Sequence, residues 1–464
     1  MYSYTLGHFR TAHFFLLFID LLIDSVKLIG IVYLVSFCGY LDYTLVDVQN
    51  PAKPSAFVER ISWINWTWPN NIEADRNVVF DTSEMIRKEG YPVETHVIRT
   101  EDGYLLTLHR IPGDNGSPPV LLQHGFFCTS AVWVILGKGK GLAYLLADRG
   151  YDVWLGNFRG NTYSRAHISL FSSNSTFWDF SLNELGVYDL PAMITYITNM
   201  RSQPLHSFIG HSMGATCFYI MATERPEIAR MIKIMISLAP TVFVNYITSP
   251  LQYLIFLKDY KMLMRFFFHE FLLSRFVRIF LTHACDLNIT KDICSNVMFI
   301  MWGYDREQFN YLLLPHIVGH FPAGVSFNTI AHYIQIFQSG KFRQYDYGRA
   351  KNILIYNSVE PPDYNLASIT LPIALFYGPG DLLDNIMDVK RLYHELPNVV
   401  DIYEVPWRYF NHADFIWGKN APKLVYERIL RIIRIENSNN VTSIIKIKDE
   451  CYTLNLYNDD YDTI

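Results

Sequence analysis

The sequence predicts an α/β protein whose central sheet is mostly parallel, with helices on both faces and a mainly helical insertion late in the sheet. Apolar runs of strand length alternate with helical patterns through the first half of the chain. Four of them are predicted to be buried strands: 120–125, 151–157, 206–212 and 232–240. Buried strands that alternate with helices at this spacing are typical of a parallel sheet covered on both sides.

The other elements follow from the same patterns. Residues 94–112 predict two strands joined by a turn. Between 241 and 368 the alternation gives way to long apolar, helix-like runs. It then resumes with a strand at 371–378, a helix at 385–397, a strand at 401–406 and a helix at 421–433. We therefore predict five regions: a leader (1–41), the first part of the core (42–240), a helical cap or lid (241–368), the second part of the core (369–436) and a C-terminal extension (437–464).

The composition excludes two classes of protein. Half of the 464 residues are apolar, which is too many for a disordered chain. The 44 acidic residues against 39 basic ones give a net charge of −5, so we expect no nucleic-acid partner, which would require a basic face. A globular protein with a large apolar core remains.

The first 41 residues are mostly apolar and are predicted to direct the chain into the secretory pathway. Asp20, Asp24 and Lys27 interrupt the stretch, and each would be costly near the centre of a membrane span. Residues 28–41 have the length of the apolar part of a signal peptide. The alternative is an uncleaved signal anchor, which would leave the protein attached to a membrane.

Entry into that pathway would permit glycosylation and disulfide formation. Possible N-glycosylation sequons occur at Asn65, Asn174, Asn288 and Asn440, and a weaker one, followed by proline, at Asn115. Cys285 and Cys294 enclose a short polar loop that suits a local disulfide. Cys128 and Cys217 lie in apolar surroundings, where a free cysteine behaves as a small hydrophobic residue.

The motif Gly210-His211-Ser212-Met213-Gly214 fits G-x-S-x-G at a predicted strand–helix junction. The string alone is a weak signal, but a nucleophile elbow requires this context. The tight turn exposes the serine hydroxyl, and only glycine fits beside the adjoining strand and helix. Ser212 is therefore the predicted nucleophile.

A serine hydroxyl needs a base, which in this type of fold follows an acid late in the chain. Two histidines meet that condition. His394 falls inside a predicted surface helix, whereas His412 lies in a loop after the strand at 401–406, and we predict His412 as the base. Asp381 and Asp384 both follow the strand at 371–378. We predict Asp381 as the acid that orients the imidazole, and Asp384 as the N-cap of the next helix.

Acyl transfer also needs two N–H donors for the oxyanion. The residue after the nucleophile supplies one, here Met213, and the loop after an earlier strand supplies the other. We assign the second donor to the amide of Phe126, and a structural role to His124 in the same loop. The sequence has neither H-E-x-x-H nor paired C-x-x-C motifs, so we expect no metal and no cofactor.

Together these residues resemble the acid lipase family, which includes gastric and lysosomal acid lipases and their arthropod relatives. The likeness covers about 76 to 434 and includes EDGYLLTLHRIP, LLADRGYDVWLGNFRGNTYSRAH, GHSMG and NHADFIWGKNAPKLVY. It implies an α/β-hydrolase core under a helical cap with a mobile lid, and calcium-independent hydrolysis of triacylglycerols or sterol esters. The family's catalytic triad falls on Ser212, Asp381 and His412, its oxyanion amides on Phe126 and Met213, and its cap disulfide on Cys285 and Cys294.

We therefore expect a secreted or lysosomal lipase that acts on neutral lipids at a lipid–water interface. The apolar stretch from about 250 to 281, which also carries lysines and arginines, is the predicted lipid-binding face of the cap. Two alternatives stay open. One is a carboxylesterase of narrower or short-chain range, and the other is a lipid-binding protein that kept the fold and lost the chemistry.

Overall fold

A computed structural model describes residues 80–252, 270–271, 275–287 and 290–437. The predicted leader (1–41), the start of the first core region, most of the stretch from 250 to 281 and the extension after 437 lie outside the described residues. None of the described helices is long and apolar enough to cross a membrane.

The central sheet is mostly parallel, as predicted. Its strands lie in the order β1-β2-β4-β3-β6-β7-β10-β11, and a short strand, β5, pairs with β2. Only the pairings of β2 with β1, β4 and β5 are antiparallel. The strands are β1 (Glu94–Arg99), β2 (Tyr104–Ile111), β3 (Pro119–Gln123), β4 (Asp152–Gly156), β5 (Ala166–His167), β6 (Leu205–His211), β7 (Ile232–Leu238), β10 (Ile373–Tyr377) and β11 (Val399–Glu404). Each predicted strand is present, although β11 begins two residues before the predicted start.

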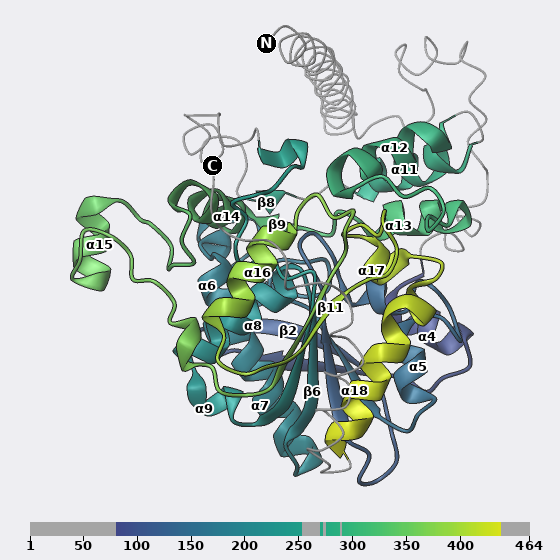
Figure 1. The fold of residues 1–464 in the computed structure, drawn as a ribbon, viewed down its shortest axis with the longest axis horizontal. Coiled ribbons are helices and arrows are strands. Elements are labelled where there is room, and N and C mark those ends of the chain that lie inside the picture. Colours follow the sequence, from purple (N-terminus) through teal and green to yellow (C-terminus); the bar gives the residue numbers. More distant parts are fainter. Residues whose placement is uncertain (1–79, 253–269, 272–274, 288–289, 438–464) are drawn as a thin grey trace, which may run out of the picture. The chain divides into compact units, whose positions relative to one another are not determined.

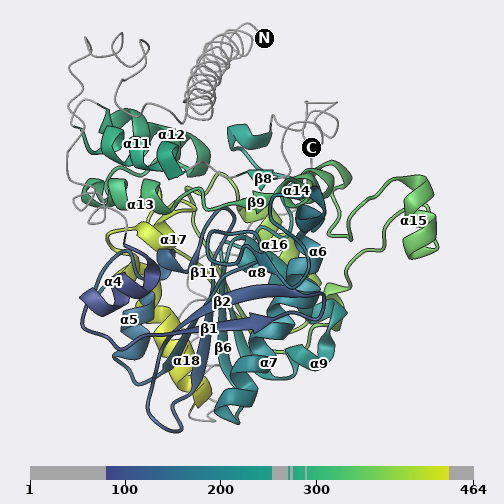
Figure 2. The ribbon, with the colours of Figure 1, turned by 180° about the vertical axis from the view of Figure 1, so that it is seen from behind.

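Helices cover both faces of the sheet (Figures 1 and 2). One face carries α4 (Thr82–Lys88), α5 (Leu142–Ala147) and α18 (Glu427–Asn437), and the other carries α7 (Leu190–Arg201), α8 (Met213–Glu224), α9 (Pro226–Ala229) and α16 (Ile386–Glu395). Each layer encloses its own core of buried apolar side chains. Short turns complete these layers: η1 (Ser130–Trp133), η2 (Ser175–Trp178), α6 (Leu182–Glu184), η3 (Leu185–Asp189), η6 (Leu366–Ser368), α17 (Asp414–Trp417) and η7 (Pro422–Tyr426).

Between β7 and β10, most of the described secondary structure is helical. Its described elements are β8 (Glu270–Phe271), α11 (Arg275–Asp286), α12 (Lys291–Trp302), η5 (Tyr311–Leu313), α13 (Leu314–His320), β9 (Val325–Ser326), α14 (Phe327–Ser339) and α15 (Arg349–Tyr356). In both views α11, α12 and α13 lie beyond one end of the sheet, next to α17 (Figures 1 and 2). The described residues belong to one compact unit, so the boundaries at 240, 368 and 436 stay a prediction.

The parallel strands bring the predicted site residues to one edge of the sheet. Ser212 directly follows β6, and Phe126 follows β3, the neighbour of β6. Asp381 follows β10 and His412 follows β11, the last two strands in the order. Because parallel strands end at the same edge, these four loops can meet there.

Candidate active site

Ser212 occupies the sharp turn between β6 and α8. Its backbone has φ 54° and ψ −120°, a conformation that residues with side chains rarely adopt. The Ser212 amide donates to the carbonyl of Leu238 on β7 (2.9 Å), and its carbonyl accepts from the amide of Ala215 (2.9 Å). The strained turn is therefore held from the sheet side and from the helix side.

The two glycines of the motif are required by close packing. A Cβ atom on Gly210 would lie 2.8 Å from the amide nitrogen of Ala215. One on Gly214 would lie 2.5 Å from the carbonyl oxygen of Gln123 at the end of β3. Both distances are shorter than carbon can approach these atoms. The steric reasoning from the sequence is confirmed at both positions.

His412 and Asp381 form a buried pair. The imidazole Nδ1 donates to Asp381 Oδ2 at 2.7 Å, and the two residues are only 4% and 6% exposed. The other oxygen, Oδ1, accepts from the amides of Leu383 (2.7 Å) and Asp384 (2.9 Å). These bonds fix the carboxylate, which in turn fixes the tautomer of His412 that leaves Nε2 free to accept a proton.

His211, which precedes the nucleophile, contacts the loop of the base. Its Nε2 donates to the carbonyl of His412 at 2.9 Å, and the two ring centres are 4.8 Å apart. Burial, and then the nearby His412, hold the pKa of His211 well below its usual value, so the ring is neutral. We assigned no role to His211 from the sequence. The one feature of the sequence that indicates a role for His211 is its position directly before Ser212.

The loop after β3 lies against the nucleophile. A Cβ atom on Gly125 would lie 3.0 Å from Cβ of Ser212, which places the neighbouring Phe126 beside the motif. Met213 is the first residue of α8, where an amide has no partner within the helix. The assignment of the Phe126 and Met213 amides to an oxyanion stays a prediction.

His124 holds that loop in place. Its Nδ1 donates to the carbonyl of Gly125 (2.8 Å), while Nε2 accepts from the amide of Phe158 (3.2 Å) and the side chain of Asn161 (3.1 Å). Burial lowers the pKa of His124 to about 4, so the ring stays neutral. These contacts match the structural role predicted for it.

The end of α12 contacts the loops that carry Asp381 and His412, through Trp302 and the following Gly303. The carbonyl of Trp302 accepts from the amides of Leu382 (3.3 Å) and His412 (3.4 Å). The side chain of Asn411 donates to the carbonyl of Gly303 (2.9 Å). The predicted insertion therefore contacts the loops that carry Asp381 and His412. No sequence pattern indicated this contact, because it joins residues about 80 to 110 positions apart.

Comparison with known proteins identifies the family of the chain. The profile of the alpha/beta hydrolase fold family matches residues 118–406, and that of a partial alpha/beta-hydrolase lipase region matches 82–137. Lipase 3 of Drosophila melanogaster is 41% identical over 76% of this chain and 92% of its own. Gastric triacylglycerol lipase of Rattus norvegicus is 37% identical, covering 79% and 93%. Lysosomal acid lipase/cholesteryl ester hydrolase of Homo sapiens is 38% identical, covering 78% and 92%.

The chain belongs to the acid lipase family of α/β-hydrolases. It is therefore an ester hydrolase, and the resemblance inferred from its motifs is confirmed. The catalytic roles of Ser212, Asp381 and His412 are proposals that rest on the geometry above.

One detail of the acid loop predicted from the sequence is wrong. Asp384 is not the N-cap of α16, because the helix begins one residue later and Asn385 caps it by accepting from the amide of Met387 (2.9 Å). Asp384 is instead 1% exposed, and neither carboxyl oxygen has a hydrogen-bond partner among the described residues. Burial raises its pKa well above the usual value, and nearby Asp381 adds to the effect. His394 is an exposed residue of α16, as expected.

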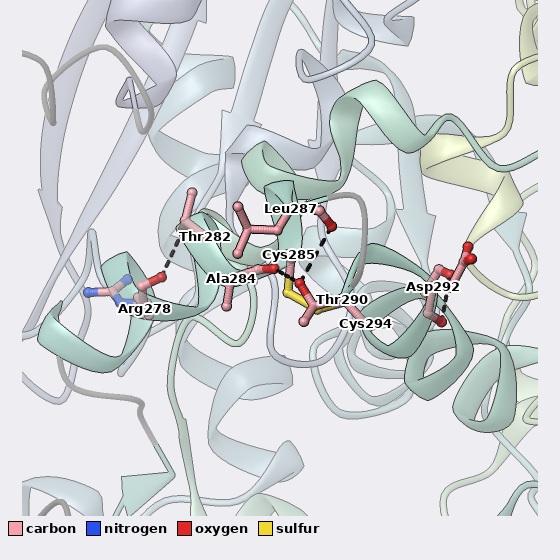
Figure 3. The surroundings of a disulfide bond; sticks show 9 residues. Arg278, Thr282, Ala284, Cys285, Leu287, Thr290, Asp292 and Cys294 are labelled. Carbon is pink, nitrogen blue, oxygen red and sulfur yellow. Dashed lines mark hydrogen bonds between the residues drawn. A yellow bond between two sulfur atoms is a disulfide. The ribbon is translucent and has the colours of Figure 1, made fainter. Parts of the chain in front are cut away.

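The structure joins Cys285 and Cys294 in a disulfide that links the end of α11 to α12 (Figure 3). Between them, the hydroxyl of Thr290 donates to the carbonyl of Ala284. Cys128 and Cys217 are free and buried, as predicted.

Of the sequons, Asn174 and Asn115 are exposed. Asn65, Asn288 and Asn440 lie outside the described residues. Glycosylation at any of these sites stays a prediction.

Proposed function

We propose that this protein is a serine lipase that hydrolyses the carboxylic esters of neutral lipids, either triacylglycerols or sterol esters. The observation that carries the proposal is the buried bond between His412 and Asp381 at the sheet edge where β6 delivers Ser212. The relatives named above support the substrate class, because they include a triacylglycerol lipase and a cholesteryl ester hydrolase.

The reaction proceeds through an acyl-enzyme. His412 Nε2 takes the proton of the Ser212 hydroxyl as the oxygen attacks the ester carbonyl, and Asp381 stabilises the imidazolium. The tetrahedral intermediate then expels the alcohol, which receives the proton from His412. A water molecule then attacks the acyl-enzyme through the same two steps, with His412 as the base and then the acid, and the fatty acid is released.

The oxyanion of each intermediate is stabilised by the amides of Phe126 and Met213. A donor of this kind contributes about 3–4 kcal/mol to the transition state, because it is already oriented and dry. The helix α8, which begins at Met213, adds its positive N-terminal end to the same site.

We further propose that the protein works at a lipid–water interface. Among the described residues, α12 carries an apolar stripe at helical spacing, with Ile293, Val297 and Ile300 exposed by 63%, 47% and 39%. Contact with lipid would bury this stripe, and each Å² of apolar surface buried would contribute about 25 cal/mol of favourable free energy. The basic, apolar stretch from 250 to 281, predicted from the sequence as a lipid-binding face, lies mostly outside the described residues.

A location reached through the secretory pathway, either extracellular or lysosomal, fits this proposal. The Cys285–Cys294 disulfide is of the kind that persists in an oxidising compartment. If residues 1–41 are retained rather than cleaved, the enzyme is anchored to a membrane.

The experiment is ester hydrolysis with acyl chains of four to eighteen carbons, for wild type and Ser212→Ala. We expect turnover of long-chain triacylglycerol to rise steeply once droplets form, while soluble esters show simple saturation. Butyrate esters cleaved far faster than oleate esters at equal interface area would establish the carboxylesterase alternative. Lipid binding with no turnover by the wild type would establish the binding-protein alternative.

A further inference from the structure

Tyr333 of α14, in the predicted insertion, reaches two threonine hydroxyls beside the Ser212 turn. Its hydroxyl donates to that of Thr216 at 3.2 Å and lies 3.1 Å from that of Thr241. The two threonine hydroxyls are themselves 3.1 Å apart, so the three groups form a closed triangle. Because each hydroxyl can donate once and also accept, the three groups can satisfy one another.

Both threonines belong to the elements that hold Ser212. Thr216 lies in the first turn of α8, and its amide donates to the carbonyl of Ser212 at 3.1 Å. Thr241 follows β7, the neighbour of β6 in the sheet, and both threonines are buried. Burial raises the pKa of Tyr333, so its hydroxyl keeps its proton and remains a donor even in mild alkali. The hydroxyl of Tyr333 is therefore fixed to the frame of the Ser212 turn.

The ring of Tyr333 contacts the loop that carries the predicted oxyanion donor. It packs edge to face against the ring of Phe126, with the ring centres 5.8 Å apart and the planes at 84°. The next residue of the loop, Phe127, has φ 60°, a strained value that persists only where surrounding contacts hold it. The carbonyl of Phe127 accepts from the amide of Ala323, also in the predicted insertion, at 2.7 Å. The predicted insertion therefore holds this loop at two adjacent residues.

We propose that Tyr333 is a positioning residue that sets the spacing between the Phe126 amide and Ser212. Its hydroxyl binds the Ser212 turn and its ring holds the Phe126 loop, so one side chain joins loops that follow two different strands. Groups that act together in catalysis must be held within about 0.5 Å of their productive geometry. Tyr333 acts through Phe126, so the proposal rests on the oxyanion role of Phe126 in the proposed function.

The test removes the hydroxyl and the ring in separate steps. Tyr333→Phe and Thr241→Val each lose one hydroxyl at nearly constant volume, and each should lower kcat on a soluble ester about tenfold with little change in KM. The double variant should lose little more than either single variant, because both break the same triangle. Tyr333→Ala, which also removes the ring, should lower kcat by about 10²-fold.

The affinity for a soluble trifluoromethyl ketone gives a readout that a purely structural role would not change. The Ser212 oxygen bonds to the ketone carbon, its proton passes to His412, and the carbonyl oxygen becomes an oxyanion. Because this adduct imitates the tetrahedral intermediate, its inhibition constant should weaken by the same factor as kcat/KM in each variant.

Tyr219→Phe is the matched control. Tyr219 is a buried residue of α8 whose hydroxyl donates to that of Ser237 on β7 at 3.1 Å, so this variant also loses a buried hydroxyl between α8 and the β7 region. It should keep the wild-type kcat and ketone affinity even if its stability falls. Wild-type kinetics and ketone affinity in Tyr333→Phe would overturn the proposal, whatever the result for Tyr333→Ala.

This outcome is separable from the failure of the proposed function. A wild type that neither hydrolyses esters nor binds the ketone would overturn the proposed function, and the role of Tyr333 with it. A wild type that does both, together with an unaffected Tyr333→Phe, would overturn the role of Tyr333 alone.

Discussion

His211 Nε2 donates to the backbone carbonyl of His412 at 2.9 Å, so the residue before Ser212 restrains the loop that carries His412. Ser212 directly follows β6, whereas His412 lies on the loop after β11, three places further along the sheet. This bond therefore joins two loops that follow strands three places apart in the sheet. The contacts of Trp302 and Gly303 also restrain this loop.

The first prediction concerns this bond. His211→Ala should lower kcat by about 10²-fold with little change in KM, because a shift of about 1 Å in the base costs that much. Steady-state kinetics on a soluble ester measures it. His206→Ala is the matched control, since His206 is also buried on β6 but bonds to Ser207 (2.7 Å), far from the catalytic edge. If both variants keep wild-type kcat, His211 has no positioning role.

The second prediction concerns the triad. Ser212→Ala and His412→Ala should each reduce turnover by about 10⁶-fold, and the double variant should lose little more, because the residues act as a unit. Asp381→Asn should cost up to about 10⁴-fold by favouring the wrong tautomer. His394→Ala, on the exposed side of α16, is the control and should remain active. Near-normal turnover by His412→Ala would show that another group is the base.

The third prediction concerns the contact between the acid and base loops. Gly303 has φ 123°, and a Cβ atom there would lie 2.2 Å from the carbonyl oxygen of Gly380. Gly303→Ala should lower the free energy of unfolding by about 3–5 kcal/mol and reduce kcat, because it forces the Asp381 loop away. Gly348 has φ 88° with open space around it, so Gly348→Ala should cost about 1–3 kcal/mol and leave kcat unchanged. Equal effects in denaturant titrations would contradict the proposed clash.

The fourth prediction concerns the buried carboxyl of Asp384. Its raised pKa means that the folded state keeps a proton that the unfolded chain releases above about pH 4. Wild-type stability should therefore fall with rising pH by up to about 1.4 kcal/mol per unit from this group, until its folded pKa is passed. Asp384→Asn should be more stable than wild type at neutral pH and similar near pH 4. A stability difference that does not change with pH would show that Asp384 is ionised when folded.

The fifth prediction concerns the disulfide between α11 and α12. Replacing Cys285 and Cys294 with serine should lower stability by about 2–3 kcal/mol. Hydrogen exchange should become faster in α11 and α12 but not in the central sheet, because the bond joins these two helices directly. Cys128→Ala serves as the control for loss of a buried free thiol. Mass mapping of non-reduced peptides that finds both thiols free would contradict the bond.

The local patterns of the sequence were sufficient for the fold and for the groups at strand ends. β6 and β10 are continuous apolar runs, and the residues after them are placed by topology, so Ser212 and Asp381 could be located. The order of nucleophile, acid and base along the chain then selected His412. Each of these inferences depends either on residues that are close in sequence or on a general rule of this fold, such as the order of the catalytic residues along the chain.

The supporting contacts could not be predicted because they depend on tertiary packing. Trp302 ends α12 and Gly303 follows it, and the pattern of this helix does not show what it packs against. Asp384 and Asn385 are both residues that often cap helices. Because α16 begins at Ile386, Asn385 is the cap and the side chain of Asp384 is buried instead. As a result, a buried carboxyl whose oxygens have no hydrogen-bond partner in the described part of the chain lies three residues after Asp381.

The most direct test of the central claim is mass mapping of the enzyme after reaction with a fluorophosphonate, or with a slowly deacylating long-chain ester. We predict a single covalent adduct on the peptide that contains Ser212, formed with the same pH dependence as ester turnover and absent from Ser212→Ala and His412→Ala. An adduct on another residue, or ester hydrolysis that persists in Ser212→Ala, would contradict an acyl-enzyme on Ser212.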